Sequence, residues 1–189
     1  MNSVEIVVRQ AVREDAPLIA RAVAMAIGDE EALRSYCGED YLGVLTLIAE
    51  GDDTQYSWRN GLVAEVDGVV VGAIVGYDGA QLRTLRDGTF AILQEAPGRV
   101  PTIADETEAG EYYLDSVGVM PEFCGQGVGR ALIEALCERG LSEGHEYAGL
   151  IVDCDNPRAE KLYTSLGFER VGTRIFFGHQ MWHLQRRLL

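Results

Sequence analysis

The most constraining feature of this chain is a glycine-rich turn between a strand-like and a helix-like segment. Residues 111–119 are rich in strand-forming side chains, and residues 128–139 carry apolar side chains at helical spacing. Gly125, Gly127 and Gly129 remove side chains from the turn between them. Backbone N–H groups at the start of a helix can then approach an anion, and the helix adds partial positive charge. The sequence therefore predicts a strand–turn–helix unit that can hold a phosphate or pyrophosphate.

Glycine spacing alone fits a tight turn without a ligand equally well. A P-loop is excluded, because no Gly-Lys-Ser/Thr follows the turn. A dinucleotide fingerprint fits poorly, because Arg130 stands where its third glycine is expected. A flavin- or nicotinamide-binding domain is therefore a third interpretation, which a coloured or nicotinamide-bound preparation would support.

Strand-like and helix-like segments alternate along the chain, which predicts an α/β (α+β) protein with helices packed on a mixed or parallel sheet. Asp67-Gly68 is a strong hairpin signal. Residues 29–60 are expected to be helical in part. Residues 78–110 are expected to form an irregular insertion in a single domain of 1–189, with one short helix near 90–93, because their apolar content is thin. We expect strands at 4–8, 62–66, 69–76, 111–119, 147–153, 168–173 and 181–187, and helices at 15–27, 128–139 and 157–166.

Charge and composition exclude several classes of function. The formal net charge of −14 argues against a nucleic-acid partner and against docking on an anionic membrane, but it is compatible with a cationic substrate. The spacings of Cys37, Cys124, Cys137 and Cys154 match no zinc module and no redox pair, so no metal is expected. Residues 1–9 contain no long apolar run, and we expect a cytoplasmic protein.

A second motif follows the strand expected at 147–153. Asn156 is a good N-cap, Pro157 suits the first helical position, and Gly167 is a good helix stop. Asn156 and Tyr163 are about two helical turns apart, so they share one side of the helix. By spacing alone, the segment is a capped amphipathic helix in which Tyr163 packs against the core.

Together, the two motifs resemble the GNAT superfamily of N-acetyltransferases. The turn is similar to the family's Arg/Gln-x-x-Gly-x-Gly/Ala loop, and Asn156 to Phe168 is similar to its Asn-x-x-Ala-x-x-x-Tyr-x-x-x-Gly-Phe segment. The resemblance is close over about 111–173, looser over 4–27 and 61–77, and does not extend to 78–110. Cys124 departs from the pattern, because the family carries Arg or Gln at the head of the loop.

The resemblance implies a mixed, largely antiparallel central sheet with helices on both faces. It also implies that acetyl-CoA, the acetyl donor, lies in a V-shaped opening between the strands at 111–119 and 147–153. In this interpretation, backbone groups of Val117 and Val119 hold the pantetheine, and Asn156 contacts the cofactor nearby. Main-chain amides of the loop hold the pyrophosphate, which adds the residues Cys124, Gly125, Gln126, Gly127, Val128, Gly129 and Arg130.

The implied reaction is direct transfer of an acetyl group to a primary amine of a small molecule or peptide. Tyr163 matches the family's general acid, and a phenol suits proton donation to a thiolate. For the base we favour Asp115 over Glu111, since strand alternation places both on one face, and a purely structural Asp115 is equally compatible. The histidines at 145, 179 and 183 are weaker candidates, although the last two could line a substrate pocket.

Two points stay open in the sequence. A non-catalytic acyl-CoA sensor would keep the same loop, although it would not need Tyr163, and a homodimer is common in the family but not required here. The acceptor is expected to be selected by residues 28–60 and 78–110, and the acidic residues 105, 106, 108 and 111 could favour a cationic amine.

Overall fold

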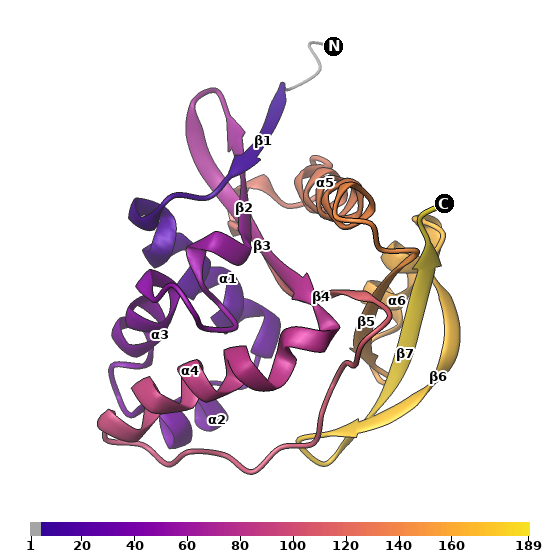
Figure 1. Ribbon diagram of the computed structural model, residues 1–189. Coiled ribbons are helices and arrows are strands. Elements are labelled where there is room, and N and C mark those ends of the chain that lie inside the picture. The colour runs from indigo at the N-terminus through magenta and orange to yellow at the C-terminus, as the bar shows by residue number, and fades with distance from the viewer. Residues whose placement is uncertain (1–4) are drawn as a thin grey trace.

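A seven-stranded sheet in the order β1-β2-β3-β4-β5-β7-β6 forms the centre of the computed structural model, which describes residues 5–189 (Figure 1). Among these strands only β4 and β5 pair in parallel, and every other neighbouring pair is antiparallel. This confirms the expected mixed, largely antiparallel sheet. Val4, predicted to begin the first strand, lies outside the described residues. The strands are β1 Ile6–Gln10, β2 Gly61–Val66, β3 Val69–Asp78, β4 Tyr112–Val119, β5 Tyr147–Asp153, β6 Glu169–Phe176 and β7 His179–Arg187.

Helices cover both faces of the sheet, as the resemblance implied. One face, which we call the α1 face, packs against α1 (Ala16–Ile27), α2 (Glu30–Cys37) and α3 (Tyr41–Glu50). The opposite face, the α5 face, packs against α5 (Val128–Ser142) and α6 (Pro157–Ser165). Figure 1 shows α1 and α3 on one side of the strands and α5 on the other. The two faces have separate apolar cores, so a site that joins them must pass through the sheet.

Local sequence signals explain most element boundaries. The side chains of Asp29 and Asp40 cap α2 and α3 by accepting hydrogen bonds from the backbone N–H groups three residues on. The residues Asp67 and Gly68 both adopt positive φ angles, as a two-residue hairpin turn between β2 and β3 requires. None of the helices among residues 5–189 is both long and apolar enough to cross a membrane.

The first part of the segment expected to be an irregular insertion is helical, so the prediction is wrong over residues 79–95. After a short 3₁₀ turn at 79–81, α4 runs from Leu82 to Glu95 over 14 residues, much further than the helix predicted near 90–93. Leu82, Leu85 and Leu93 are buried on its inner side, but Arg86 and Thr89 are buried there too. These two polar residues interrupt the apolar period, which is why the sequence pattern understated the helix.

Residues 96–111, which we call the strap, connect α4 to β4 without forming a helix or a strand. In Figure 1 the strap runs from the end of α4, past the β6–β7 turn, to the start of β4. It therefore lies beside the α1 face of the sheet, next to the end of the parallel pair.

Candidate functional site

The parallel strands β4 and β5 pair at only two positions and then diverge. Tyr112 pairs with Ala148 and Tyr113 with Gly149, whereas β4 continues to Val119. Met120 directly follows β4, and its backbone N–H donates to the Val71 carbonyl of β3 at 2.8 Å. Because successive backbone groups of a strand point to alternate edges, the N–H and C=O groups of residues 117 and 119 point to the other edge. These groups therefore face the gap between β4 and β5.

The glycine-rich turn has the backbone geometry of an anion site. Gly125 and Gly127 have φ angles of +79° and +90°, a region that side chains with a Cβ disfavour. Ala131 donates the first described hydrogen bond inside α5, to the Gly127 carbonyl at 3.0 Å. The N–H groups of Val128 to Arg130 therefore lack intrahelical partners. Main-chain donors at the positive end of a 15-residue helix fit a diphosphate well.

Side chains around this turn brace it. The Gln126 side-chain amide donates to the Glu122 carbonyl at 3.1 Å, and the Arg130 guanidinium donates to the Ser165 hydroxyl at 3.0 Å. The second bond joins α5 to α6. Cys124, which stands where the family has Arg or Gln, is exposed. Any diphosphate contact at this turn would therefore come mainly from the main chain.

The two α6 residues singled out by the motif lie on the α5 face. The Asn156 side chain accepts a hydrogen bond from the Ala159 N–H at 3.1 Å, so it caps α6 as expected. Tyr163 is half-buried and packs edge-on against Phe168, with ring centroids 6.0 Å apart. Burial raises the pKa of Tyr163 to about 12. The phenol therefore remains protonated at neutral pH and can donate a proton.

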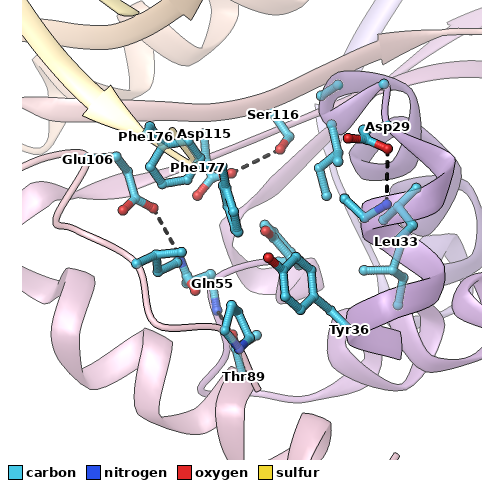
Figure 2. A pocket seen from close by; sticks show the side chains of 18 of the residues that line it. Asp29, Leu33, Tyr36, Gln55, Thr89, Glu106, Asp115, Ser116, Phe176 and Phe177 are labelled. Carbon is cyan, nitrogen blue, oxygen red and sulfur yellow. Dashed lines mark hydrogen bonds between the residues drawn. The ribbon is translucent and has the colours of Figure 1, made fainter. Parts of the chain in front are cut away.

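A β-bulge in β4 re-aims the side chain of Asp115. Along the β3–β4 pair, Val75 is opposite Ser116 and Gly76 is opposite Leu114, which leaves Asp115 without a partner. Regular alternation would send Asp115 and Ser116 to opposite faces. The bulge instead lets both line one cavity on the α1 face, as Figure 2 shows.

This cavity has a volume of about 560 Å³, within the range of sites that enclose small ligands. It lies against the gap in the sheet, because its wall includes Asp115 from β4 and Ile151 from β5. Its other walls come from α2, α3, α4, the strap and the β6–β7 turn. Both segments that the sequence analysis expected to select the acceptor, 28–60 and 78–110, contribute residues to the cavity wall.

A buried polar network connects two carboxyl groups of the cavity. The Tyr77 hydroxyl donates to the Asp115 carboxylate at 2.6 Å. The Gln55 side-chain amide donates to the Tyr77 oxygen and to Glu106, each at 3.2 Å. The Arg86 guanidinium forms an ion pair with Glu106. The one buried cation of this network pairs with Glu106, whereas Asp115 is held by hydrogen bonds alone.

The surroundings shift the pKa values of both groups upward. Burial raises the pKa of Asp115, although hydrogen bonds from Tyr77 and Ser116 oppose the shift. Burial, reinforced by the negative charge of Asp115, raises the pKa of Glu106 to about 7, with Arg86 acting in the opposite direction. The two groups titrate as a pair, and that pair holds a proton closer to neutral pH than exposed carboxyl groups do.

Sequence reasoning did not single out Glu106 as a catalytic candidate. It lies on the strap, where no periodic pattern indicates which side chains turn inward. The only signal was the acidic cluster around it, and the cluster proves to be heterogeneous. Asp105 is partly exposed and pairs with Arg83 and Arg86, whereas Glu106 is 3% exposed.

Glu111, the second candidate base, has a different environment. Its carboxylate accepts hydrogen bonds from Thr107 at 2.6 Å and Gln185 at 2.7 Å, and it lies 2.8 Å from the His183 ring nitrogen. Burial alone would raise the pKa of Glu111, but hydrogen bonds from these three partners outweigh it and lower the pKa. Glu111 is not part of the cavity wall. Its contacts join the end of the strap to β7, so of the two candidate bases only Asp115 lines the cavity.

The three histidines occupy three different environments. The His183 ring forms a hydrogen bond with the Glu111 carboxylate, and the His145 ring packs against Tyr112. His179 alone of the three lines the cavity, with its Nδ1 atom 3.2 Å from the Asp153 carboxylate. Within residues 5–189, no three His, Cys, Asp or Glu side chains gather as a possible metal site.

Comparison with known sequences places these features in context. The profile of the Acetyltransferase (GNAT) family matches residues 31–168. A mycothiol acetyltransferase of Kocuria rhizophila is 36% identical over 111 residues, which cover 54% of this chain and 36% of that protein. The N-alpha-acetyltransferase RimI of Mycobacterium tuberculosis is 44% identical over 64 residues, which cover 34% of this chain and 39% of that protein. The chain therefore spans less than half the length of these curated relatives.

Solved structures agree over nearly the whole chain. A crystal structure of an acetyltransferase superposes with a TM-score of 0.82 at 31% identity, covering 97% of this chain and 100% of that one. An N-acetyltransferase from Staphylococcus aureus Mu50 also superposes with a TM-score of 0.82, at 25% identity, with 95% and 99% coverage. The similarity thus includes the strap and α4, which the sequence motifs did not reach.

Proposed function

Because the chain belongs to the Acetyltransferase (GNAT) family, we propose that it transfers the acetyl group of acetyl-CoA to a primary amine. The observation that carries the proposal is the gap between β4 and β5. On the α5 face, the gap is flanked by α5, whose start offers main-chain donors for a diphosphate. On the α1 face, it meets a cavity that holds the Asp115 and Glu106 carboxyl groups. A donor and an acceptor bound on opposite faces would meet inside the sheet.

The residues that would hold acetyl-CoA are mainly backbone groups. N–H groups between Gly125 and Arg130 would bind the diphosphate. Backbone groups of Val117 and Val119 face the gap and would bind the amides of the pantetheine. The side-chain nitrogen of Asn156 is not used by its capping bond and would add a contact. When bound, acetyl-CoA supplies the acetyl group as a thioester.

The chain's own groups would move the protons of the reaction. The ammonium form of the acceptor would first lose one proton to solvent, and Asp115 would accept the second proton from the nitrogen as the new N–C bond forms at the acetyl carbon and the C–S bond breaks. Its raised pKa suits this role, because a base works best with a pKa near the working pH. Tyr163 would give its phenolic proton to the departing sulfur, and both groups would then exchange protons with solvent.

Calorimetric titration of the folded protein with acetyl-CoA tests the proposal. We expect saturable binding, and weaker binding of acetylpantetheine, because this analogue lacks the diphosphate that the α5 amides would bind. Equal affinity for the two compounds would remove the role of the α5 amides. No heat from either acetyl-CoA or CoA would contradict the proposed function.

A further inference from the structure

The cavity on the α1 face has a roof made of three segments that contact one another. The Arg99 N–H donates to the Ser35 carbonyl at 3.0 Å, and a side chain at Gly98 would overlap the Tyr36 carbonyl. The strap therefore lies directly on the end of α2. From the other side, the β6–β7 turn brings the Phe177 ring to 5.5 Å from the Tyr36 ring. Figure 2 shows both rings at the cavity.

The cavity wall combines aliphatic side chains, aromatic rings and acidic groups. Tyr36, Phe90 and Phe177 are among its aromatic residues, and no described Lys or Arg side chain lines it. The carboxyl groups of the wall are those of Asp29, Glu106, Asp115 and Asp153.

One of these acids, the half-buried Asp115, has no cationic partner among the described residues. Arg86 pairs with Glu106 and Asp105, and His179 lies beside Asp153. No described Lys, Arg or His side chain forms an ion pair with Asp115. Asp115 accepts hydrogen bonds from Tyr77 and Ser116 but has no counter-charge. Partial burial disfavours its charged form, so a ligand that brings an ammonium group to Asp115 would gain affinity from this site.

We infer that the acceptor is a small primary amine with an aromatic, apolar body and no carboxylate. This inference rests on the acetyl transfer proposed above and narrows its acceptor from small molecule or peptide to one class. The ammonium group would offset the charge of Asp115, and the rings of the wall would pack against the body. A carboxylate on the acceptor would meet like charge from the wall. The roof would obstruct the continuing chain of a peptide.

Thiol release from acetyl-CoA measures acceptor choice directly. The first matched pair is 2-phenylethylamine and phenylalanine, which differ only by a carboxylate. We expect kcat/KM to be at least roughly tenfold higher for 2-phenylethylamine, because like charges placed together are strongly unfavourable. Ethylamine, which lacks the ring, and the peptide Phe-Gly-Gly, which continues past the amine, are both expected to be poorer acceptors than 2-phenylethylamine.

A matched pair of variants tests the aromatic wall. Phe177→Ala should raise KM for 2-phenylethylamine by roughly fivefold, because it removes one ring contact. It should leave KM for acetyl-CoA unchanged, since Phe177 lies on the opposite side of the sheet from α5. Ile175→Ala, at an exposed site on the same hairpin outside the cavity wall, should change neither constant.

The outcomes separate this inference from the proposed function. If phenylalanine or Phe-Gly-Gly is acetylated as well as 2-phenylethylamine, the acceptor class is wrong while acetyl transfer stands. The same conclusion follows if another amine is acetylated while 2-phenylethylamine gives no turnover, or if Phe177→Ala and Ile175→Ala behave alike. If acetyl-CoA does not bind, the proposed function itself fails.

Discussion

At the scale of single residues, the candidate site depends on two neighbouring carboxyl groups, of which Glu106 pairs with Arg86 and Asp115 has no cationic partner among the described residues. A carboxylate loses its hydration when buried, and a second negative charge nearby adds to the cost. Tyr77 and Gln55 lie between Asp115 and Glu106 and hold them by hydrogen bonds. The arrangement thus favours one proton in the pair near neutral pH. Asp115 can act as a base when that proton lies on Glu106.

Replacing the base tests this assignment. Asp115→Asn keeps the size of the side chain but cannot accept the proton, so we expect kcat to fall by roughly 100-fold, a typical contribution of a general base. Affinity for acetyl-CoA should be unchanged. Glu111→Gln is the matched variant. It should lower the melting temperature, because Glu111 has three hydrogen-bond partners, and it should reduce kcat much less than Asp115→Asn does. A reversal of these two effects on kcat would make Glu111 the base.

The coupling of the two acids makes a separate prediction about pH. In the wild type, protonation of the pair should lower kcat as the pH falls, and because the pKa values of both groups are raised, this acid limb should lie at higher pH than for an exposed carboxyl group. Glu106→Gln removes the neighbouring negative charge, so Asp115 should lose its proton at lower pH. The acid limb of the kcat profile should therefore move to lower pH when both proteins are measured with the same amine. An unmoved limb would show that the two groups are not coupled.

At the scale of elements, the turn before α5 depends on left-handed backbone at Gly127. Gly127→Ala should lower the free energy of unfolding by about 1 kcal/mol, because Ala disfavours a positive φ. It should also weaken acetyl-CoA binding by moving the α5 amides. Gly172→Ala is the control, since Gly172 is exposed, has ordinary φ and has open space around it. Equal effects of the two variants, measured by denaturant unfolding and calorimetry, would contradict the account of this turn.

The buried side of α4 packs against tyrosine residues next to the carboxyl pair. Leu82 is 2% exposed and clusters with Leu85, Tyr77 and Tyr113. Leu82→Ala should lower the free energy of unfolding by about 3 kcal/mol, as the loss of a buried leucine usually does. Thr84→Ala, on the exposed side of the same helix, should change it by less than about 0.5 kcal/mol. Denaturant unfolding of both variants would reveal similar losses if α4 did not pack as described.

At the scale of the whole molecule, sequence analysis predicted the parts that carry local signals. The glycine turn, the Asn156 cap and the hairpin at Asp67 follow from short-range chemistry, and all three are present. The β4 bulge, the strap and the contact between Tyr36 and Phe177 depend on residues far apart in the chain. No local period marks them, so the sequence could not predict that Glu106 lies beside Asp115.

In the proposed function, the two faces of the sheet bind different substrates. The α5 face would bind the donor, the α1 face would bind the acceptor, and the gap between β4 and β5 is the route between them. Tyr163 on α6 and Asp115 on β4 lie on opposite faces of the sheet. In the proposed reaction, this division would let one group supply a proton to the leaving sulfur while another takes one from the amine.

Amine-dependent thiol release from acetyl-CoA, compared between the wild type and Tyr163→Phe, tests the central claim most directly. We expect release in the wild type to require an amine, and kcat to fall by roughly 100-fold in Tyr163→Phe while acetyl-CoA affinity is kept. Acetyl-CoA binding without release for any amine would instead indicate a sensor of the cofactor and would contradict the account.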